Sequence, residues 1–306
     1  METTQIICPK CNSNEVIKRG ILKTEKGDRQ RLGCNHCNHR FILNTPFKRM
    51  RNNEKVITAT MDMYYSGMSF RKINKHMNQF YPTSVNPSTI YRWIMKYVGV
   101  MANFTDKQQI RIGKNLQGDE VEYHRRTNTN KKGVEKNWFI DSIDTYTRFL
   151  VYSVYTRKRT PETITKFYKN VKKRTGEQVE IVSTDGLKLY PRALKKTFGL
   201  KLYHGGETAS TSPIIHNITK SDSGRFNYKI ERFHNTLRER TKVMRGFHGC
   251  VDSAQTILKG FEIYYNWIRE NMALENATPS QIAVPQVQIQ DKNKWLELIN
   301  RGYNGN

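Results

Sequence analysis

Apolar residues recur at helical spacing between residues 53 and 99, and this pattern predicts three short helices. The second helix is expected to begin after Ser69, a residue type that caps helix N-termini. The third is expected to begin at Asn86 and Pro87, because proline is favoured in the first turn of a helix. The segment therefore reads as a small all-helical domain.

From residue 118 to about 283 the pattern changes to strands followed by helices. Three runs rich in β-branched and aromatic residues come first: VEYHRRTNTN, NWFIDSIDT and RFLVYSVYT. A helical segment, PETITKFYKNVKKR, then precedes the apolar run VEIVSTD and a helix from Leu189 to Thr197. Three antiparallel strands followed by alternating helices and strands indicate an α/β core of the RNase H-like type, a mixed sheet flanked by helices.

Two segments lack such a pattern. Residues 101–117 predict a linker, and residues 284–306, a Gln-rich stretch followed by WLELI, predict a peripheral C-terminal tail. The chain is thus expected to be multidomain, with these parts: a small ribbon at 1–45, a helical domain at 50–100, the linker at 101–117, the α/β core at 118–283 and the tail at 284–306.

Four of the five cysteines form two CxxC pairs, Cys8 with Cys11 and Cys34 with Cys37, separated by 22 residues (12–33). Four thiolates at this spacing suit a tetrahedral zinc ion, with each pair supplying two ligands from a tight turn. A segment this short has little core of its own, so the metal is expected to contribute much of its folding energy. A chance pair of CxxC motifs is the alternative.

The charge points to a polyanionic partner. Lys and Arg number 52 against 27 acidic residues, a formal charge of +25, and nucleic acid is the usual partner of such a chain. A ribosomal or membrane-surface protein fits the charge alone. No apolar run approaches the roughly 20 residues of a membrane span, and the N-terminus lacks the pattern of a secretory signal. We expect a cytoplasmic, nucleoid-associated protein.

With this charge, the three helices favour a helix-turn-helix that reads the DNA major groove over a dimerising bundle. The third-helix side chains expected to face double-stranded DNA are Ser88, Thr89, Tyr91, Arg92 and Lys96.

Three acidic residues form an ordered set across the α/β core. Asp119 lies in a short alternating run, Asp185 ends the apolar run VEIVSTD, and Glu231 lies in a basic helical segment. The gaps between them are 65 residues (120–184) and 45 residues (186–230). Carboxylates at neighbouring strand ends can converge on hard divalent cations, which prefer oxygen ligands. Such cations assist the cutting and joining of DNA.

Other interpretations exist for acidic residues in this part of the chain. Asp141 and Asp144 are expected to cap a turn or to lie on a solvated edge. Glu231 could instead pair with Asn235 or Arg238 on the same helix. His234 could contact phosphate or serve as a half-buried structural residue.

The stretches GDEVEYH, FIDSIDTYTRFLVYSVYTRKRT, VSTDGLKLYPRAL and IERFHNTLRERTKVMRGF resemble the DDE insertion-sequence transposases of bacteria and archaea. The resemblance runs from about 117 to 283, and relatives also carry an N-terminal zinc ribbon and helix-turn-helix. The stretch YHRRTNTNKKGVEKNW departs from relatives, whose first hairpin is often shorter.

The resemblance implies a catalytic set of Asp119, Asp185 and Glu231 that holds two Mg²⁺ or Mn²⁺ ions, with Asp119 bridging both. It implies hydrolytic nicking at element ends, followed by attack of the freed 3′-hydroxyl on target DNA by a homo-oligomer, at least a dimer. The residues then expected to hold substrate phosphates are Arg232, Arg238, Arg240, Lys242 and Arg245.

Two rival functions stay open. A zinc-ribbon and helix-turn-helix regulator with an inactive core would bind DNA without cutting it. A nuclease or resolvase would cut without joining. A tyrosine recombinase is disfavoured, because the basic helix has no HxxR pattern after His234.

Overall fold

The computed structural model describes residues 6–23, 29–42, 45–126, 134–199, 213–219, 227–242, 247–248 and 250–305. The chain divides into two compact units, Met1–Ala59 and Thr60–Asn306. None of the described helices is long and apolar enough to cross a membrane.

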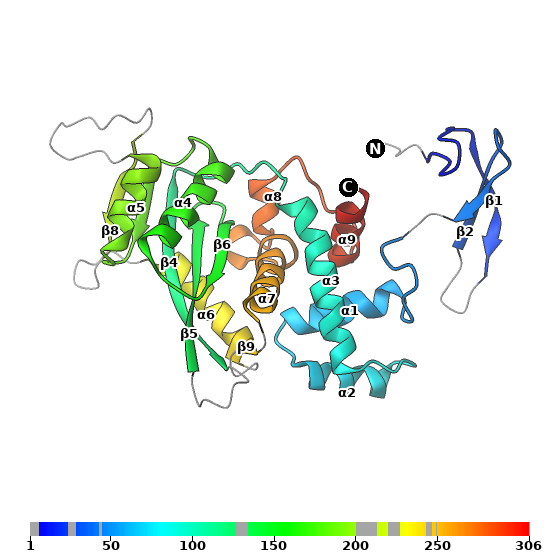
Figure 1. Ribbon diagram of the computed structural model, residues 1–306, viewed down its shortest axis with the longest axis horizontal. Helices are drawn as coiled ribbons and strands as arrows, with labels where there is room; N and C mark the ends of the chain where they lie inside the picture. The colour runs from blue at the N-terminus through cyan, green and yellow to red at the C-terminus, as the bar shows by residue number, and fades with distance from the viewer. Residues whose placement is uncertain are drawn as a thin grey trace. The chain divides into compact units, whose positions relative to one another are not determined.

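The first unit contains a three-stranded antiparallel sheet in the order β1-β2-β3 (Figure 1). The sheet lies within the small ribbon expected at 1–45. Cys34 ends the middle strand, and Cys37 lies in the turn that follows it. The strands are β1 (Val16–Leu22), β2 (Arg29–Cys34) and β3 (Arg40–Ile42).

Three helices form where the apolar spacing places them. They are α1 (Glu54–Tyr65), α2 (Phe70–Phe80) and α3 (Pro87–Thr105). The hydroxyl of Ser69 accepts a hydrogen bond from the amide of Lys72 at 3.3 Å and caps α2 as expected. The turn before α3 is fixed by Asn78, whose side-chain oxygen accepts a bond from the amide of Val85 at 3.1 Å.

The predicted linker at 101–117 is mostly occupied by regular structure. Helix α3 continues to Thr105, because Val98, Met101 and Thr105 extend its buried stripe. Strand β4 then begins at Asn115. Only residues 106–114 connect these two elements.

The C-terminal segment is not peripheral, so that prediction was wrong. After α8 (Pro279–Ala283), helix α9 (Lys294–Asn304) packs against α3. It buries Trp295, Leu298 and Ile299, and the indole of Trp295 donates to a carboxylate oxygen of Asp62 at 2.9 Å. The apolar spacing of WLELI belongs to a core-facing helix, whose partner lies about 200 residues earlier in the chain.

The close approach of α9 and α3 predicts opposite effects of two glycine substitutions. A Cβ at Gly302 would lie 2.1 Å from the carbonyl oxygen of Val100. We expect Gly302→Ala to lower the free energy of unfolding by about 1–3 kcal/mol in urea titrations. Gly99→Ala is the control: its Cβ meets no described atom within 4 Å. It should stabilise α3 by about 0.5–1 kcal/mol. A Gly302→Ala protein as stable as wild type would contradict this packing.

The second unit is built on a six-stranded mixed sheet in the order β6-β5-β4-β7-β8, with β9 also pairing with β4. Strands β4, β5 and β6 are antiparallel, whereas β7 and β8 run parallel to β4. This order confirms the RNase H-like core. The strands are β4 (Asn115–Arg126), β5 (Val134–Asp144), β6 (Leu150–Thr156), β7 (Ile181–Thr184), β8 (Ile215–Ile218) and β9 (Phe247–His248).

Helices cover both faces of this sheet (Figure 1). Alternate residues of β4 point to opposite faces. Gly118 and Glu120 meet α4 and α5, whereas Gln117 and Tyr123 contact α6. Helix α7 packs on β6 and continues through a π-helical turn, Tyr264–Ile268, and a 3-10 turn, Met272–Leu274. The helices are α4 (Pro161–Thr175), α5 (Leu189–Phe198), α6 (Tyr228–Lys242) and α7 (Val251–Ile263).

Candidate active site and metal centres

Asp119 is the fifth residue of β4 and lies on the face that α6 covers. Its side chain is 22% exposed, so it is accessible from solvent at the edge of the helix. One carboxylate oxygen accepts a hydrogen bond from the amide of Glu120 at 2.8 Å. The other lies 3.5 Å from Nδ1 of His234 on α6. These contacts fix the side chain and leave lone pairs on both oxygens.

Asp185 directly follows β7, the strand that pairs in parallel with β4. In that ladder Gln117 lies opposite Ser183. Asp119 lies two residues after Gln117 in β4, and Asp185 lies two residues after Ser183, one residue past the end of β7. Neighbouring strands lie about 4.8 Å apart, so the backbones of the two aspartates are adjacent. One carboxylate oxygen of Asp185 accepts a bond from the amide of Leu187 at 3.0 Å and holds the turn into α5.

Glu231 lies in the first turn of α6. The side-chain oxygen of Gln117 accepts bonds from the amides of Lys229 and Ile230 at 3.1 and 3.2 Å, which fixes this helix end over β4. Glu231 is exposed and precedes His234 by one turn. Its expected alternative partners bond each other instead, because Arg238 donates to Asn235 at 3.2 Å.

The polar stripe of α6 agrees with the sequence pattern. Glu231, Asn235, Arg238 and Lys242 are exposed on one side of the helix. The three carboxylates of Asp119, Asp185 and Glu231 do not form a group whose donor atoms all lie within 4.8 Å of one another. Asp119 lies on β4, Asp185 follows the neighbouring strand β7, and Glu231 lies on α6, without forming a closed ligand cluster.

His234 bridges the site to the sheet, and sequence reasoning missed this role. Its Nε2 lies 3.0 Å from a carboxylate oxygen of Asp141 on β5, and its Nδ1 faces Asp119. Both His234 and Asp141 are buried. The expectation of a turn cap or solvated edge was wrong for Asp141. It was right for Asp144, which accepts bonds from the amide and hydroxyl of Thr147 at 2.8 and 2.7 Å.

This arrangement predicts a pH dependence of stability. Burial by itself lowers the pKa of His234, but the hydrogen bonds and charges of Asp119 and Asp141 outweigh it and raise the pKa to about 9. The folded-state pKa thus exceeds the ordinary value of 6.5. The protonated imidazole stabilises the fold fully below pH 6.5 and loses this contribution as the pH rises through 9. We expect the free energy of unfolding, measured in urea without added divalent cation, to fall by up to about 3 kcal/mol over that range.

The matched variant for that measurement is His234→Gln, which keeps a polar side chain but does not titrate. Subtracting its pH profile from that of wild type removes the contributions of other groups. Parallel profiles for the two proteins would contradict a protonated His234 in the fold.

A second buried acid lies on the opposite face of β4. Glu120 accepts hydrogen bonds from Arg159 and from the hydroxyl of Tyr190 on α5. Its side chain is 4% exposed, and burial is the main reason that its pKa is raised. These contacts fix the loop before α4 and the start of α5 beside Asp185.

The expected phosphate-binding residues of α6 divide into three groups. Arg232, Arg238 and Lys242 are exposed, as a DNA contact requires. Arg240 is not, and this prediction was wrong: its side chain is buried, with the guanidinium carbon 3.8 Å from the centre of the Tyr64 ring of α1. Arg245 lies outside the described residues. The register of the helix turns Arg240 toward the helical domain, where it stacks on an aromatic face.

The expected DNA-facing residues of α3 also divide into exposed residues and one residue that contacts the rest of the protein. Ser88, Arg92 and Lys96 are exposed, and Thr89 is partly exposed. The hydroxyl of Tyr91 instead donates to Ser253 on α7 at 3.0 Å, so this side chain joins the helical domain to the core. The structure therefore does not support Tyr91 as a DNA contact.

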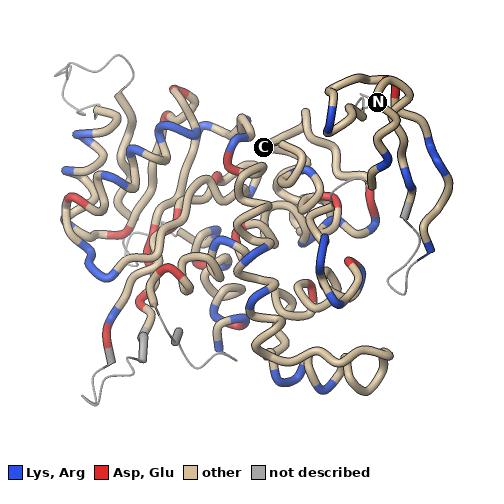
Figure 2. The backbone as a smooth tube through the Cα atoms, turned by 45° about the vertical axis from the view of Figure 1, so that its right-hand side comes forward, with Lys and Arg blue, Asp and Glu red and all other residues tan. Residues whose placement is uncertain are grey.

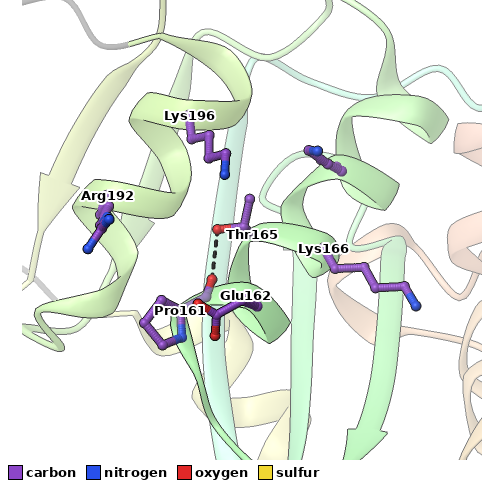
Figure 3. A pocket seen from close by; sticks show the side chains of 7 residues that line it. Pro161, Glu162, Thr165, Lys166, Arg192 and Lys196 are labelled. Atoms are coloured by element: carbon purple, nitrogen blue, oxygen red, sulfur yellow. Dashed lines mark hydrogen bonds between the residues drawn. The ribbon is translucent and has the colours of Figure 1, made fainter.

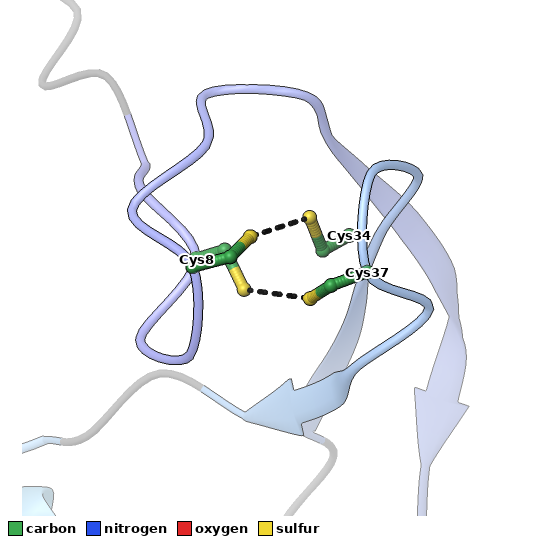
Figure 4. Close-up of side chains that lie close together, drawn as sticks. Cys8, Cys34 and Cys37 are labelled. Carbon is green, nitrogen blue, oxygen red and sulfur yellow. Dashed lines mark hydrogen bonds between the residues drawn. The ribbon is translucent and has the colours of Figure 1, made fainter.

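The four cysteines of the first unit form a group whose donor atoms all lie within 4.8 Å of one another. Figure 4 shows thiols from the two turns facing one another. The Sγ–Sγ distances are 3.6 Å for Cys8–Cys37 and for Cys11–Cys34. A tetrahedral zinc ion with Zn–S bonds of about 2.3 Å needs sulfur atoms roughly 3.8 Å apart. The cluster is therefore compatible with zinc.

The two cysteine turns share a backbone feature. Each CxxC pair is followed by an asparagine with a positive φ, 57° at Asn12 and 55° at Asn38. Asparagine tolerates this left-handed conformation better than most residues. The repeated turn directs the two thiols of each pair toward the same point.

Comparison with known proteins identifies the core. Residues 133–271 match the DDE domain family DDE_Tnp_IS240. This segment is a DDE transposase domain. The match supports a transposase of the insertion-sequence type, with the metal-dependent polynucleotidyl transferase activity of DDE domains. Asp185 and Glu231 lie within the matched range of the DDE domain, and Asp119 precedes it by 13 residues (120–132).

Solved structures of low identity also match the chain. One is a simian T-cell lymphotropic virus intasome in complex with a PP2A regulatory subunit, at 9% identity and a TM-score of 0.39, covering 74% of this chain and 71% of that one. Another is the Drosophila P element transposase strand transfer complex, at 11% identity and a TM-score of 0.34, covering 84% and 80%. No curated protein matches the chain significantly. The assignment therefore rests on the family match.

Proposed function

We propose that this transposase nicks DNA at the ends of its own element and joins the freed 3′-hydroxyl to target DNA. Asp119, Asp185 and Glu231 are the catalytic carboxylates in this proposal. The observation that supports it most is the parallel register of β4 and β7, in which Gln117 lies opposite Ser183, two residues before Asp119 and Asp185. Carboxylates on adjacent strands suit Mg²⁺ or Mn²⁺, which favour oxygen ligands.

When bound, two such ions stabilise charge on the attacking and leaving oxygens of an in-line displacement. Other residues of the chain position the catalytic carboxylates. His234 holds Asp119 toward α6, and Gln117 anchors the N-terminus of α6, so that Glu231 stays above the sheet. Closure of the site requires the Glu231 side chain to turn toward the two aspartates when cations bind.

Recognition of DNA is separate from the chemistry. Arg232, Arg238 and Lys242 line the exposed side of α6 and hold substrate phosphates without reading sequence. Ser88, Arg92 and Lys96 of the helix-turn-helix, together with a zinc-loaded ribbon, recognise the element ends. Because two ends must be joined to one target, the active species is at least a dimer.

The test is a strand-transfer reaction. A labelled duplex carrying one end of the element that encodes the chain is incubated with supercoiled plasmid in Mg²⁺, Mn²⁺ or no divalent cation. Joining that requires the metal supports the proposal. Cutting without joining would assign the protein to the nucleases, and tight binding with neither reaction would assign it to the DNA-binding regulators.

A further inference from the structure

A hollow of about 290 Å³ lies between α4 and α5, on the sheet face opposite α6. Four basic side chains line it: Lys166 and Lys169 of α4, and Arg192 and Lys196 of α5. Figure 3 shows Arg192 and Lys196 across from Glu162 and Thr165, with Lys166 further along α4. We call these four basic residues the α4–α5 basic surface. They follow helical spacing, i and i+3 on α4 and i and i+4 on α5, so each pair shares one face of its helix.

The charges of this surface are not neutralised within the described chain. All four basic side chains are exposed, and none forms an ion pair with a described carboxylate. Neighbouring lysines do form such pairs, Lys172 with Glu177 at 3.3 Å and Lys114 with Glu180 at 2.6 Å. Figure 2 shows the Lys and Arg positions along both helices.

Glu162 is the acid of the hollow, and it is engaged locally. Hydrogen bonds from its own backbone amide and from Thr160 lower its pKa, and the charges of Arg192 and Lys196 lower it further. It occupies the positive N-terminal end of α4. Four positive charges therefore remain against one negative charge, which leaves the hollow suited to an anion.

A second hollow of about 270 Å³ lies on the other side of α4, against β6. Lys166 lines both hollows, and Thr163, Tyr152 and Asn170 add hydroxyl and amide groups to the second. Lys, Arg, Thr, Tyr and Asn side chains are those that contact phosphate and sugar in protein–DNA complexes. Two adjacent hollows that share a lysine suit a chain of phosphates better than a single small anion.

The surface adjoins the proposed active site. Helix α5 begins four residues after Asp185, and Arg192 is the fourth residue of that helix. Arg159, just before α4, binds Glu120 on the strand of Asp119. The segment before α4 and the start of α5 thus both contact Glu120, the residue next to Asp119 on β4.

We propose that the α4–α5 basic surface binds the phosphate backbone of duplex DNA extending away from the active site. The course of the DNA away from the active site rests on the proposed function. The affinity of this surface for the phosphates of duplex DNA does not. The phosphates belong either to target DNA or to the element beyond its end, and the experiment separates these two sources.

The first measurement is the salt dependence of DNA affinity. The triple variant Lys169→Gln, Arg192→Gln, Lys196→Gln is compared with wild type in binding a plain duplex between about 0.05 and 0.2 M salt. Each lost phosphate contact lowers the slope of log affinity against log salt by about 0.9, so we expect a fall of about 3. The matched control is Lys107→Gln, Arg111→Gln, Lys292→Gln, which removes the same charge from other exposed positions. Its slope should fall by less than about 1. Equal falls in both triple variants would overturn the proposal.

The second measurement locates the DNA. A photo-crosslinking amino acid at Thr165, inside the hollow, should crosslink to duplex DNA in the full chain. Crosslinking to plain duplex assigns the surface to target DNA, and crosslinking only to duplexes with an element end assigns it to the element. No crosslink to either duplex overturns the proposal. A wild-type protein that crosslinks but never cuts or joins DNA would contradict the proposed function and leave this surface in place.

Discussion

Replacing Asp185 with asparagine is expected to slow metal-dependent nicking and joining by roughly 10³-fold or more. The amide removes the negative charge that holds a divalent cation beside Asp119, and the stabilisation that such a cation gives the transition state amounts to several kcal/mol. The neutral side chain still accepts the hydrogen bond from Leu187, so the turn into α5 should persist. The measurement is the single-turnover rate of nicking in Mg²⁺ and in Mn²⁺.

The control for this prediction is Glu122→Gln. Glu122 is an exposed carboxylate on the same strand as Asp119, and it pairs with Lys136 at 3.2 Å outside the proposed site. Its loss should change the nicking rate by less than about twofold, because exposed ion pairs contribute little to stability. If Asp185→Asn retained a rate near that of wild type while folding normally, the assignment of this carboxylate would fail.

Removing the metal from the cysteine cluster is expected to unfold the ribbon. Structural zinc sites bind with an apparent free energy of about 10–16 kcal/mol, most of which acts as folding energy. The variant Cys34→Ser removes one of four ligands and should lose the zinc. Backbone amides within residues 6–42 should then lose their protection against hydrogen exchange. The affinity of the protein for element ends should also fall. Metal content and exchange are measured on the full chain.

The chain supplies a matched control in Cys250→Ser, because Cys250 is an exposed thiol outside the cluster. This variant should retain one zinc per chain and unchanged exchange in the ribbon. A Cys34→Ser protein that kept slow exchange across β1 and β2 would show that the strands fold without the metal.

The sequence predicted most of the fold because local patterns decided it. Residue Ser69 marked a helix start, and the apolar run before Asp185 marked a strand end. The basic segment that contains Glu231 was expected to be helical, and it forms α6. The packing of α9 was missed, because the partner of Trp295 is Asp62, far away in the sequence.

The site was predictable in outline but not in its contacts. A pattern of charges does not show which basic residue of a helix meets another domain, so Arg240 was expected at DNA and lies against Tyr64. Asp141 was expected at a turn or edge, yet it lies in the sheet interior under α6, where His234 compensates its charge. Both differences arise from tertiary neighbours that local spacing does not encode.

The central claim is that Asp119, Asp185 and Glu231 act as one metal centre, and Glu231 is the member that the described contacts leave apart. Side chains that act as a unit give non-additive losses when they are removed together. The decisive measurement is the rate of Mn²⁺-dependent strand transfer by Asp119→Asn, by Glu231→Gln and by the double variant. We expect each single variant to fall to the same residual rate and the double variant to fall no further. A Glu231→Gln protein within about twofold of wild type, against the roughly 10³-fold loss expected, would contradict the account.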